Sequence, residues 1–161
     1  MAKETKYPIT PAIRVLRAAD VGFTPCLYRY EERGGTAASA RELGVDEHTV
    51  IKTLVFETGR KDPLIVLMHG DREVLAKELA RVLGTKSVAP CRPEVADRHS
   101  GYQVGGTSPF GTRRPMPVYM QRTILDLEAV HINGGARGFL IRMSPRDIEE
   151  VLSPVLVDVA I

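Results

Sequence analysis

The sequence predicts an α+β (mixed α/β) protein with a barrel-like, mixed β-sheet and flanking helices. Segments with helical and strand patterns follow one another without the strict strand–helix–strand alternation of a doubly wound sheet. The β-branched run Val50–Phe56 lies within this order and is typical of a buried strand. With 161 residues, of which 43% are hydrophobic and 26% charged, the chain favours one domain. We expect a flexible N-terminal tail over residues 1–9 and a single domain over residues 10–161.

The N-terminal third predicts two helices with a strand between them. Thr10-Pro11 combines a hydroxyl N-cap with proline at the first helical position, and the helix it begins should end at Gly22. Aromatic residues make residues 23–30 a candidate strand. Thr36 can cap a short helix that ends at Gly44.

The middle of the chain predicts a hairpin followed by a helix. Residues 49–57 should form a strand largely buried on both faces, with residues 64–69 as its hairpin partner. Asp71 should cap a helix that runs through Leu83 and ends at Gly84. A short strand and a helical turn should follow, at residues 87–89 and 93–98.

The C-terminal third predicts three strands and a last helix. The strands fall at residues 118–121, 129–133 and 139–143. Gly134-Gly135 and Gly138 should break the chain between the second and third of them. Ser144-Pro145 should begin a helix that ends near Leu152.

Charge and cysteine content bound the partners and the compartment. The net charge of +2 is too small to predict nucleic-acid binding by itself. Between Gly111 and Arg146, however, the sequence has six arginines against two acidic residues. That excess is compatible with a phosphate-binding face and equally with a solvated surface. Cys26 and Cys91 form no CxxC pair, and no apolar run is long enough for a membrane span, so we expect reduced thiols in the cytoplasm.

The segment Gly101–Gly111 stands out because it has four glycines and one proline within eleven positions. Such a loop can present backbone N–H groups to an anion or to a polarised carbonyl, although a tight turn is the simpler interpretation. It is neither a phosphate loop, since Thr112-Arg113 follows it, nor a nucleophile elbow, since Phe110 replaces the last glycine. The histidines have no metal-ligand spacing, so neither a metal nor a cofactor is expected.

Lys52 is unusual because it lies inside the apolar run Val50–Phe56. An unpaired lysine buried there would cost several kcal/mol. Its ammonium group therefore either reaches solvent or faces a pocket that binds an anion or an oxygen that gains charge. Tyr28 and Tyr30 have the same parity on a neighbouring candidate strand and so share a face. One of them is a candidate pocket residue, and core tyrosines with hydrogen-bonded hydroxyls are the alternative.

Four stretches together resemble the YbaK/ProX editing family, the free-standing relatives of the editing domain inserted in prolyl-tRNA synthetase. The likeness covers about residues 10–152 and is greatest to the YbaK/EbsC-type Cys-tRNA(Pro) deacylases. The four stretches are Thr10–Ile13, Lys52–Val55, Gly101–Gly111 and Gly134–Gly138.

The resemblance implies an enzyme that hydrolyses mischarged tRNA, Cys-tRNA(Pro) first, without a cofactor and with prolyl-tRNA synthetase as a partner. It implies that Lys52 is the key lysine, set against the terminal adenosine and its phosphate. Gly105 begins the family's G-x-x-x-P loop, whose backbone holds the aminoacyl ester. The other substrate-binding residues that the resemblance implies are Tyr28, Thr53, Gly101, Tyr102, Gly106, Thr107, Ser108, Pro109, Asn133, Gly134 and Leu140.

This activity requires no protein nucleophile. An aminoacyl ester is already activated, so orientation and stabilisation of an oxyanion can suffice. In the Cys-specific members the thiol of the substrate itself is held to attack the carbonyl.

Two residues depart from the family pattern. Asn133 stands where a serine is common, and Leu140 stands where some relatives have a pocket aspartate. Because a leucine cannot bond a substrate amine, deacylation of another amino acid, such as Ala-tRNA(Pro), stays open. So does a non-catalytic module that binds aminoacyl-adenosine or a synthetase.

Overall fold

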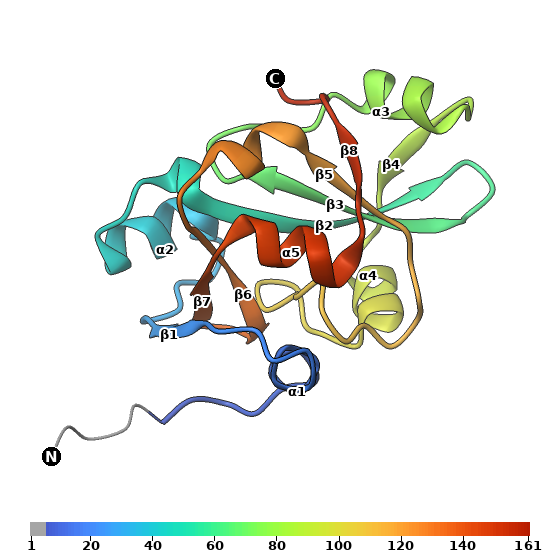
Figure 1. The fold of residues 1–161 in the computed structure, drawn as a ribbon. Helices are drawn as coiled ribbons and strands as arrows, with labels where there is room; N and C mark the ends of the chain where they lie inside the picture. The colour runs from blue at the N-terminus through green and yellow to red at the C-terminus, as the bar shows by residue number, and fades with distance from the viewer. Residues whose placement is uncertain (1–5) are drawn as a thin grey trace, which may run out of the picture.

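Helices and strands alternate irregularly along residues 6–161, which the computed structural model describes (Figure 1). The helices are α1 (Pro11–Ala18), α2 (Gly35–Leu43), α3 (Ala76–Leu83), α4 (Pro93–Ser100) and α5 (Pro145–Leu152), with 3₁₀ turns η1 (Glu47–Thr49) and η2 (Arg122–Asp126). The strands are β1 (Thr24–Leu27), β2 (Val50–Thr58), β3 (Pro63–His69), β4 (Val88–Pro90), β5 (Val118–Gln121), β6 (Val130–Ala136), β7 (Phe139–Met143) and β8 (Val155–Val157).

The strands form one mixed sheet in the order β1-β7-β6-β2-β3-β5-β8, and β4 pairs with β2. The β2–β6, β3–β5 and β5–β8 pairs are parallel, and the others are antiparallel. In Figure 1, β6 and β7 run steeply across β2 and β3, so the sheet curls. The predicted mixed sheet with flanking helices is therefore confirmed.

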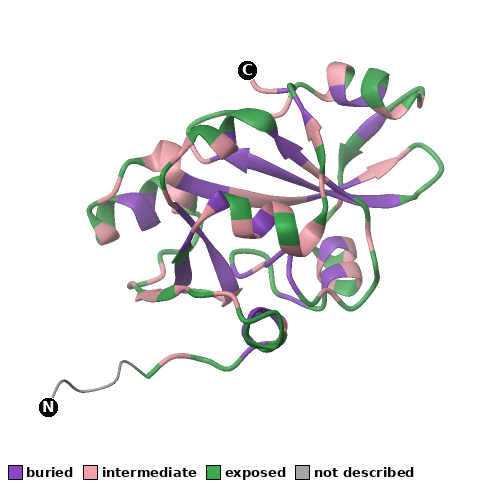
Figure 2. Ribbon diagram, in the orientation of Figure 1, coloured by how far each residue is buried: buried purple, intermediate pink, exposed green. Residues whose placement is uncertain are grey.

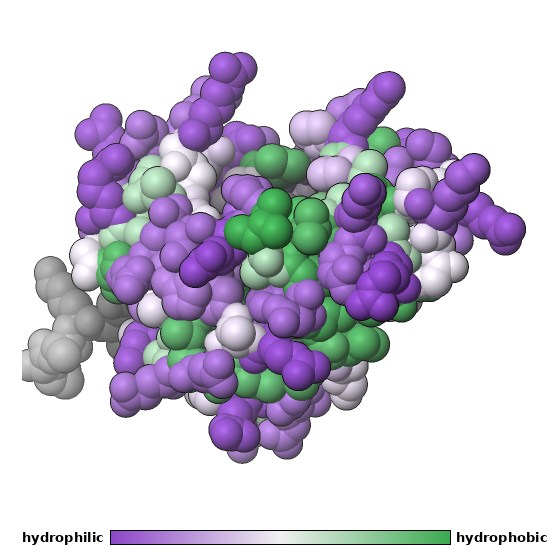
Figure 3. Space-filling model, turned by 90° about the horizontal axis from the view of Figure 1, so that it is seen from above, coloured by the Kyte–Doolittle hydropathy of each residue, from purple (hydrophilic) through white to green (hydrophobic). Residues whose placement is uncertain are grey.

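Helices cover both faces of the sheet. The larger core holds Ile13 and Leu16 of α1 and Ile148 of α5 on one face. On the other face, Leu79 of α3 and Ala40 of α2 pack in two smaller clusters. Figure 2 shows the buried residues concentrated along the central strands. Figure 3 shows the surface of the molecule from above, where apolar side chains gather near the centre and are surrounded by hydrophilic ones.

The predicted helix starts at Thr10 and Ser144 are confirmed, as both side chains accept the expected cap hydrogen bonds. The hairpin of β2 and β3 is also confirmed. The expected end of the first helix was wrong, because the chain already reverses at Asp20, which has a φ of 57°.

Four other expectations are corrected. The strand expected over residues 23–30 is only Thr24–Leu27. Thr36 does not cap α2; its hydroxyl bonds Glu47 and the Gly70 carbonyl instead. The helix expected from Asp71 begins only at Ala76. Gly134-Gly135 does not break the chain, since β6 continues through it with a β-bulge.

The expected N-terminal tail is described only in part, because residues 1–5 lie outside the described range. Residues 6–9 have no regular structure, yet the Tyr7 ring stacks on Phe139 with centroids 5.7 Å apart. The division into a tail and one domain stays a prediction. Over the described residues, no helix combines the length and apolar character needed to traverse a membrane.

Candidate functional site

The sheet opens along one edge of β2, and Lys52 lies at this opening. β2 pairs with β6 at Val50 and Ile51 and with β4 from Phe56 onward. Since β3 occupies the opposite edge of β2, β6 and β4 both lie along the same edge. Between the β6 pairing and the β4 pairing, this edge of β2 has no partner strand among the described residues. The residues there, Lys52 to Leu54, are only half-buried, unlike the strand on either side. The expectation of a strand largely buried on both faces therefore fails at the opening.

Side chains from four adjacent strands share one face beside this opening. Alternation along β2 puts Lys52 on the same face as Val50. Asn133 of β6 lies opposite Leu140 of β7, and Leu140 lies opposite Cys26 of β1. The parallel pairing of β2 with β6 brings these residues to the face that carries Lys52. The structure thus brings together three residues implied by the resemblance: Lys52, Asn133 and Leu140.

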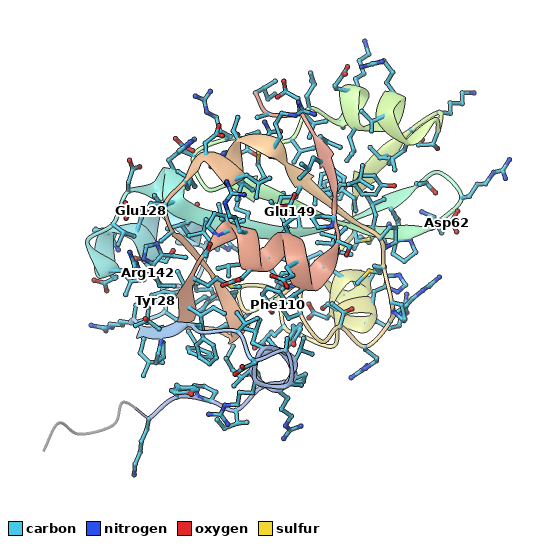
Figure 4. The ribbon with its side chains drawn as sticks, in the orientation of Figure 1. Tyr28, Asp62, Phe110, Glu128, Arg142 and Glu149 are labelled. Atoms are coloured by element: carbon cyan, nitrogen blue, oxygen red, sulfur yellow. The ribbon has the colours of Figure 1, made fainter. Side chains whose placement is uncertain are left out.

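Leu140 belongs to a small apolar cluster that also includes Tyr28. Ala40, Val50 and Leu140 are its buried members, and Cys26 and Tyr28 pack against them. Figure 4 shows Tyr28 next to β1 and β7. Burial raises the pKa of both the Tyr28 phenol and the Cys26 thiol. A thiol with a raised pKa stays protonated and is a poor nucleophile at neutral pH.

The Lys52 ammonium group is held at the rim of the opening. Its Nζ donates to the Arg72 carbonyl and lies 3.3 Å from Oε1 of Glu73. The Lys52 side chain is 17% exposed, whereas that of Glu73 is 78% exposed. The lysine is therefore neither unpaired nor fully solvated. Its cation is fixed by the turn that follows β3.

Thr53 faces the other way. Because consecutive residues of a strand point to opposite faces, its side chain lies on the face opposite Lys52. Thr53 Oγ1 is buried and has no hydrogen-bond partner within residues 6–161. The structure does not bring the Thr53 side chain together with the Lys52 face.

The glycine-rich segment, which connects α4 to β5, contacts β6 through its backbone. Nδ2 of Asn133 donates to the Gly105 carbonyl over 3.1 Å. Among residues 6–161, the N–H groups of Gly105, Thr107 and Ser108 have no hydrogen-bond partner. Free N–H groups in a glycine-rich loop can bind an anion or a developing oxyanion.

Buried side chains behind this segment hold it in shape. The Tyr102 hydroxyl donates to the Phe110 carbonyl over 2.6 Å, and burial raises the pKa of Tyr102 to about 12. The Phe110 N–H donates to Ser108 Oγ over 3.2 Å, and Pro109 is also buried. Phe110 packs in the core among residues of α1 and α5 (Figure 4). Tyr102, Ser108 and Pro109 thus have packed side chains, and Thr107 is half-buried.

The other glycines that the resemblance implies, Gly101, Gly106 and Gly134, are each required by their local geometry. Gly101 ends α4 with a φ of 79°. Gly106 lies so close to the turn between β6 and β7 that a β-carbon added to it would come 2.7 Å from the backbone nitrogen of Arg137. At Gly134, an added β-carbon would come 2.5 Å from the Phe139 ring. Close packing therefore accounts for glycine at Gly106 and Gly134.

Two further residues contact this segment: Tyr30, which the sequence offered only as an alternative to Tyr28, and Arg137, to which it gave no individual role. An added β-carbon at Gly105 would come 2.6 Å from the Tyr30 hydroxyl oxygen. The Arg137 guanidinium lies 5.0 Å from the centre of the Tyr30 ring, and its Nε donates to the Val104 carbonyl. The signal for Tyr30 was its parity with Tyr28, and the signal that could have found Arg137 was the Gly134–Gly138 stretch around it.

Two surface clefts lie outside this face. A cleft of about 310 Å³ is lined by Arg29, Tyr30, Glu31 and Glu42, and therefore borders the Gly105 region through Tyr30. A cleft of about 390 Å³ lies between α3 and β4 and contains none of the predicted site residues. We identify the site by its converging side chains and free N–H groups rather than by a deep cavity. Among residues 6–161, no three His, Cys, Asp or Glu side chains are arranged to hold a metal ion.

Two known proteins that act on aminoacyl-tRNA or tRNA, according to their names, are similar to this chain in sequence. EbsC of Enterococcus faecalis, provisionally named a Cys-tRNA(Pro)/Cys-tRNA(Cys) deacylase, is 28% identical over 92% of this chain and 91% of its own length. The proline–tRNA ligase of Desulforamulus reducens is 30% identical over 89% of this chain, which corresponds to 24% of the ligase.

A solved structure shows the same fold. It is the crystal structure of a protein provisionally described as a trans-editing enzyme for prolyl-tRNA synthetase. The two superpose with a TM-score of 0.78 over 94% of this chain and 98% of the other, at 19% sequence identity.

The family model of the aminoacyl-tRNA editing domain matches residues 31–151, which is most of the chain. This range includes β2 with Lys52, the glycine-rich segment, β6 and β7. The chain therefore belongs to the aminoacyl-tRNA editing domain family, the YbaK-type editing proteins, and is an aminoacyl-tRNA deacylase that hydrolyses an ester bond.

Proposed function

We propose that the protein edits in trans and deacylates Cys-tRNA(Pro), with prolyl-tRNA synthetase as its partner. The name of EbsC and the similarity to a proline–tRNA ligase support this substrate and this partner. One structural observation carries the proposal. Lys52, Asn133 and Leu140 share one face of the sheet, and the Asn133 amide donates a hydrogen bond to the Gly105 carbonyl of the glycine-rich segment.

Each residue has a role that its surroundings support. Lys52 presents a fixed cation at the sheet opening and binds the phosphate of the terminal adenosine. The loop N–H groups hold the ester carbonyl and stabilise negative charge on its oxygen. The cluster around Leu140 and Tyr28 packs against the small amino-acid side chain.

The substrate supplies the nucleophile, since the half-buried Cys26 thiol has a raised pKa and is not activated. The substrate sulfur forms a bond to its own carbonyl carbon, and the ester C–O bond breaks. The thiol proton ends on the ribose hydroxyl of the released tRNA. Water then opens the cyclic thioester to free cysteine.

The test is a panel of labelled Cys-tRNA(Pro), Ala-tRNA(Pro), Ser-tRNA and Cys-tRNA(Cys), each incubated with the protein. Cys-tRNA(Pro) should be deacylated fastest, and Ser-tRNA, which has a hydroxyl in place of the thiol, should be nearly inert. Equal rates with the cysteine and serine substrates would contradict substrate assistance. A protein that deacylates none of them would contradict the proposal as a whole.

Ala-tRNA(Pro) is the second candidate substrate because the Leu140 cluster is apolar. Its buried members, Ala40, Val50 and Leu140, have no polar group to bond the substrate, and an apolar surface discriminates weakly between small side chains. If alanine is released faster than cysteine, the thiol has no chemical role and water must attack the carbonyl directly.

A further inference from the structure

The bulge in β6, residues 133–136, is organised by the amide of Asn133, and Arg137 follows it in the turn to β7. Its Oδ1 accepts from the N–H groups of Gly135, over 2.7 Å, and Ala136, over 3.1 Å. These bonds use the acceptor end of the amide inside the bulge and leave its NH₂ end to point outward. The orientation of Asn133 is therefore fixed from within β6.

The bulge and the turn after it hold two successive carbonyls of the loop. Asn133 Nδ2 donates to the Gly105 carbonyl over 3.1 Å, and Arg137 Nε donates to the Val104 carbonyl over 3.0 Å. The loop lies directly on the bulge at Gly106. The Tyr30 ring stacks on the Arg137 guanidinium, and its hydroxyl lies against Gly105, so the arginine is braced from the other side.

These two bonds determine where the loop N–H groups point. In a trans peptide the carbonyl and the following N–H point in opposite directions, and the described chain has no cis peptide. With the Val104 carbonyl bound to Arg137, the Gly105 N–H points away from that side chain. With the Gly105 carbonyl bound to Asn133, the Gly106 N–H points back to Gln103, whose carbonyl accepts it over 2.7 Å.

We propose that Asn133 and Arg137 are positioning residues for the deacylation reaction. By holding the Val104 and Gly105 carbonyls, they keep the Gly105 N–H directed at the ester carbonyl of the substrate. The inference rests on the proposed function, in which this loop holds the ester. It assigns Asn133 an action through the loop backbone, and it assigns a positioning role to Arg137, which the sequence showed only as one arginine of an arginine-rich stretch.

Arg137→Lys separates positioning from tRNA binding. Lysine keeps the positive charge but puts a methylene where Nε donates to Val104. If Arg137 positions the loop, kcat should fall about tenfold or more, and KM should stay within about twofold. If it binds a phosphate instead, kcat should be retained. Arg29→Lys is the matched control, since Arg29 is exposed, lines the neighbouring cleft and has no hydrogen bond or ion pair within residues 6–161; it should leave both constants unchanged.

Asn133→Asp gives a readout that a merely structural role would not produce. Its carboxylate repels the Gly105 carbonyl, whereas the protonated carboxyl can donate to it. Burial and the Gly105 carbonyl raise the pKa of this carboxyl group, whereas the Gly135 and Ala136 N–H groups that donate to it lower the pKa, so it takes up its proton only as the pH falls. The ratio of the Asn133→Asp kcat to the wild-type kcat should therefore be low at about pH 8 and rise toward about pH 5.

Three outcomes would overturn the inference. If the wild type is active, the inference alone is overturned when Arg137→Lys keeps the wild-type kcat. It is also overturned when the ratio of the Asn133→Asp kcat to the wild-type kcat does not change with pH. A wild type that deacylates no substrate overturns the proposed function and the inference with it. If Asn133→Asp does not fold, judged by circular dichroism, Arg137→Lys decides alone because its side chain is exposed.

Discussion

At the residue scale, Lys52 is a cation on a central strand with fixed oxygen partners. Its stem is covered, and its Nζ is directed by the Arg72 carbonyl and Glu73. Lys52→Met keeps the covered stem and removes the charge, so the fold should remain. We predict that kcat/KM for Cys-tRNA(Pro) falls about 100-fold or more, because the site loses its positive charge. Steady-state kinetics, with circular dichroism as the control for folding, would measure this.

Glu73→Gln is the matched variant for this prediction. The Glu73 side chain is 78% exposed, and exposed ion pairs contribute little to stability. Because the Arg72 carbonyl still holds the ammonium group, activity should stay within about fivefold of wild type. A loss as large as that of Lys52→Met would mean that Glu73 itself acts in the reaction.

Leu140 is the residue that we expect to control the choice of amino acid. It is 5% exposed and packs against Ala40 and Val50 on the same face as Lys52. Leu140→Ala should enlarge the site and raise the kcat/KM of a bulkier substrate, such as Met-tRNA, relative to Cys-tRNA(Pro). It should also cost about 2–5 kcal/mol of stability, measured by urea denaturation. Unchanged selectivity would place the amino-acid side chain away from this cluster.

At the scale of elements, local signals predicted the helix starts at Thr10 and Ser144 but failed where distant segments interact. The caps at Thr10 and Ser144 depend only on their own residues and the next turn. The helix expected from Asp71 starts late because residues 73–75 pair with the C-terminus. Glu73 and Leu75 donate their N–H groups to Ile161 and Val159, and no local pattern reveals these bonds.

The bulge of β6 was missed for a similar reason. Two adjacent glycines usually indicate a turn, which is why a break was expected. Here the Asn133 side chain satisfies the N–H groups of Gly135 and Ala136, so the strand continues past them. A side-chain hydrogen bond that substitutes for a strand partner is hard to predict from composition.

Thr10 links α1 to β6, and its removal should affect both elements. Its hydroxyl accepts the Ile13 N–H as an N-cap and donates to the Gly134 carbonyl. Thr10→Ala removes the cap and leaves the buried carbonyl without its partner, which should cost about 1–3 kcal/mol. Thr10→Ser keeps the hydroxyl and should lose much less. Equal urea midpoints for the two variants would contradict the double role.

At the scale of the whole molecule, the sequence makes candidate site residues visible but not their arrangement. Lys52 and the glycine-rich segment are visible in the sequence because a lysine in an apolar strand and four glycines in eleven residues are unusual. The sheet opening is not visible, because it depends on β6 and β4 sharing one edge of β2. The contact of Arg137 with Val104 also follows only from the assembled sheet.

The pH dependence of stability is a property of the whole molecule that buried histidines should control. His69 is 1% exposed, and its Nδ1 lies 2.8 Å from the His48 carbonyl, which can only accept. Nδ1 therefore carries a proton, and because burial disfavours the charged ring, Nε2 is left to accept from the Thr123 hydroxyl over 2.7 Å. Burial lowers the pKa of His69 and also that of His131.

Since the folded state binds these protons less readily than the unfolded state, their contribution to stability is complete above the unfolded pKa, about 6.5. It is lost as the pH falls through the lowered folded pKa. Urea denaturation at a series of pH values should therefore show the midpoint falling as the pH decreases below that value. His69→Gln removes one of the titrating groups and should flatten this fall, even though it lowers the midpoint at neutral pH. A wild-type midpoint that is constant or rises on acidification would contradict the assignment of a neutral, buried His69.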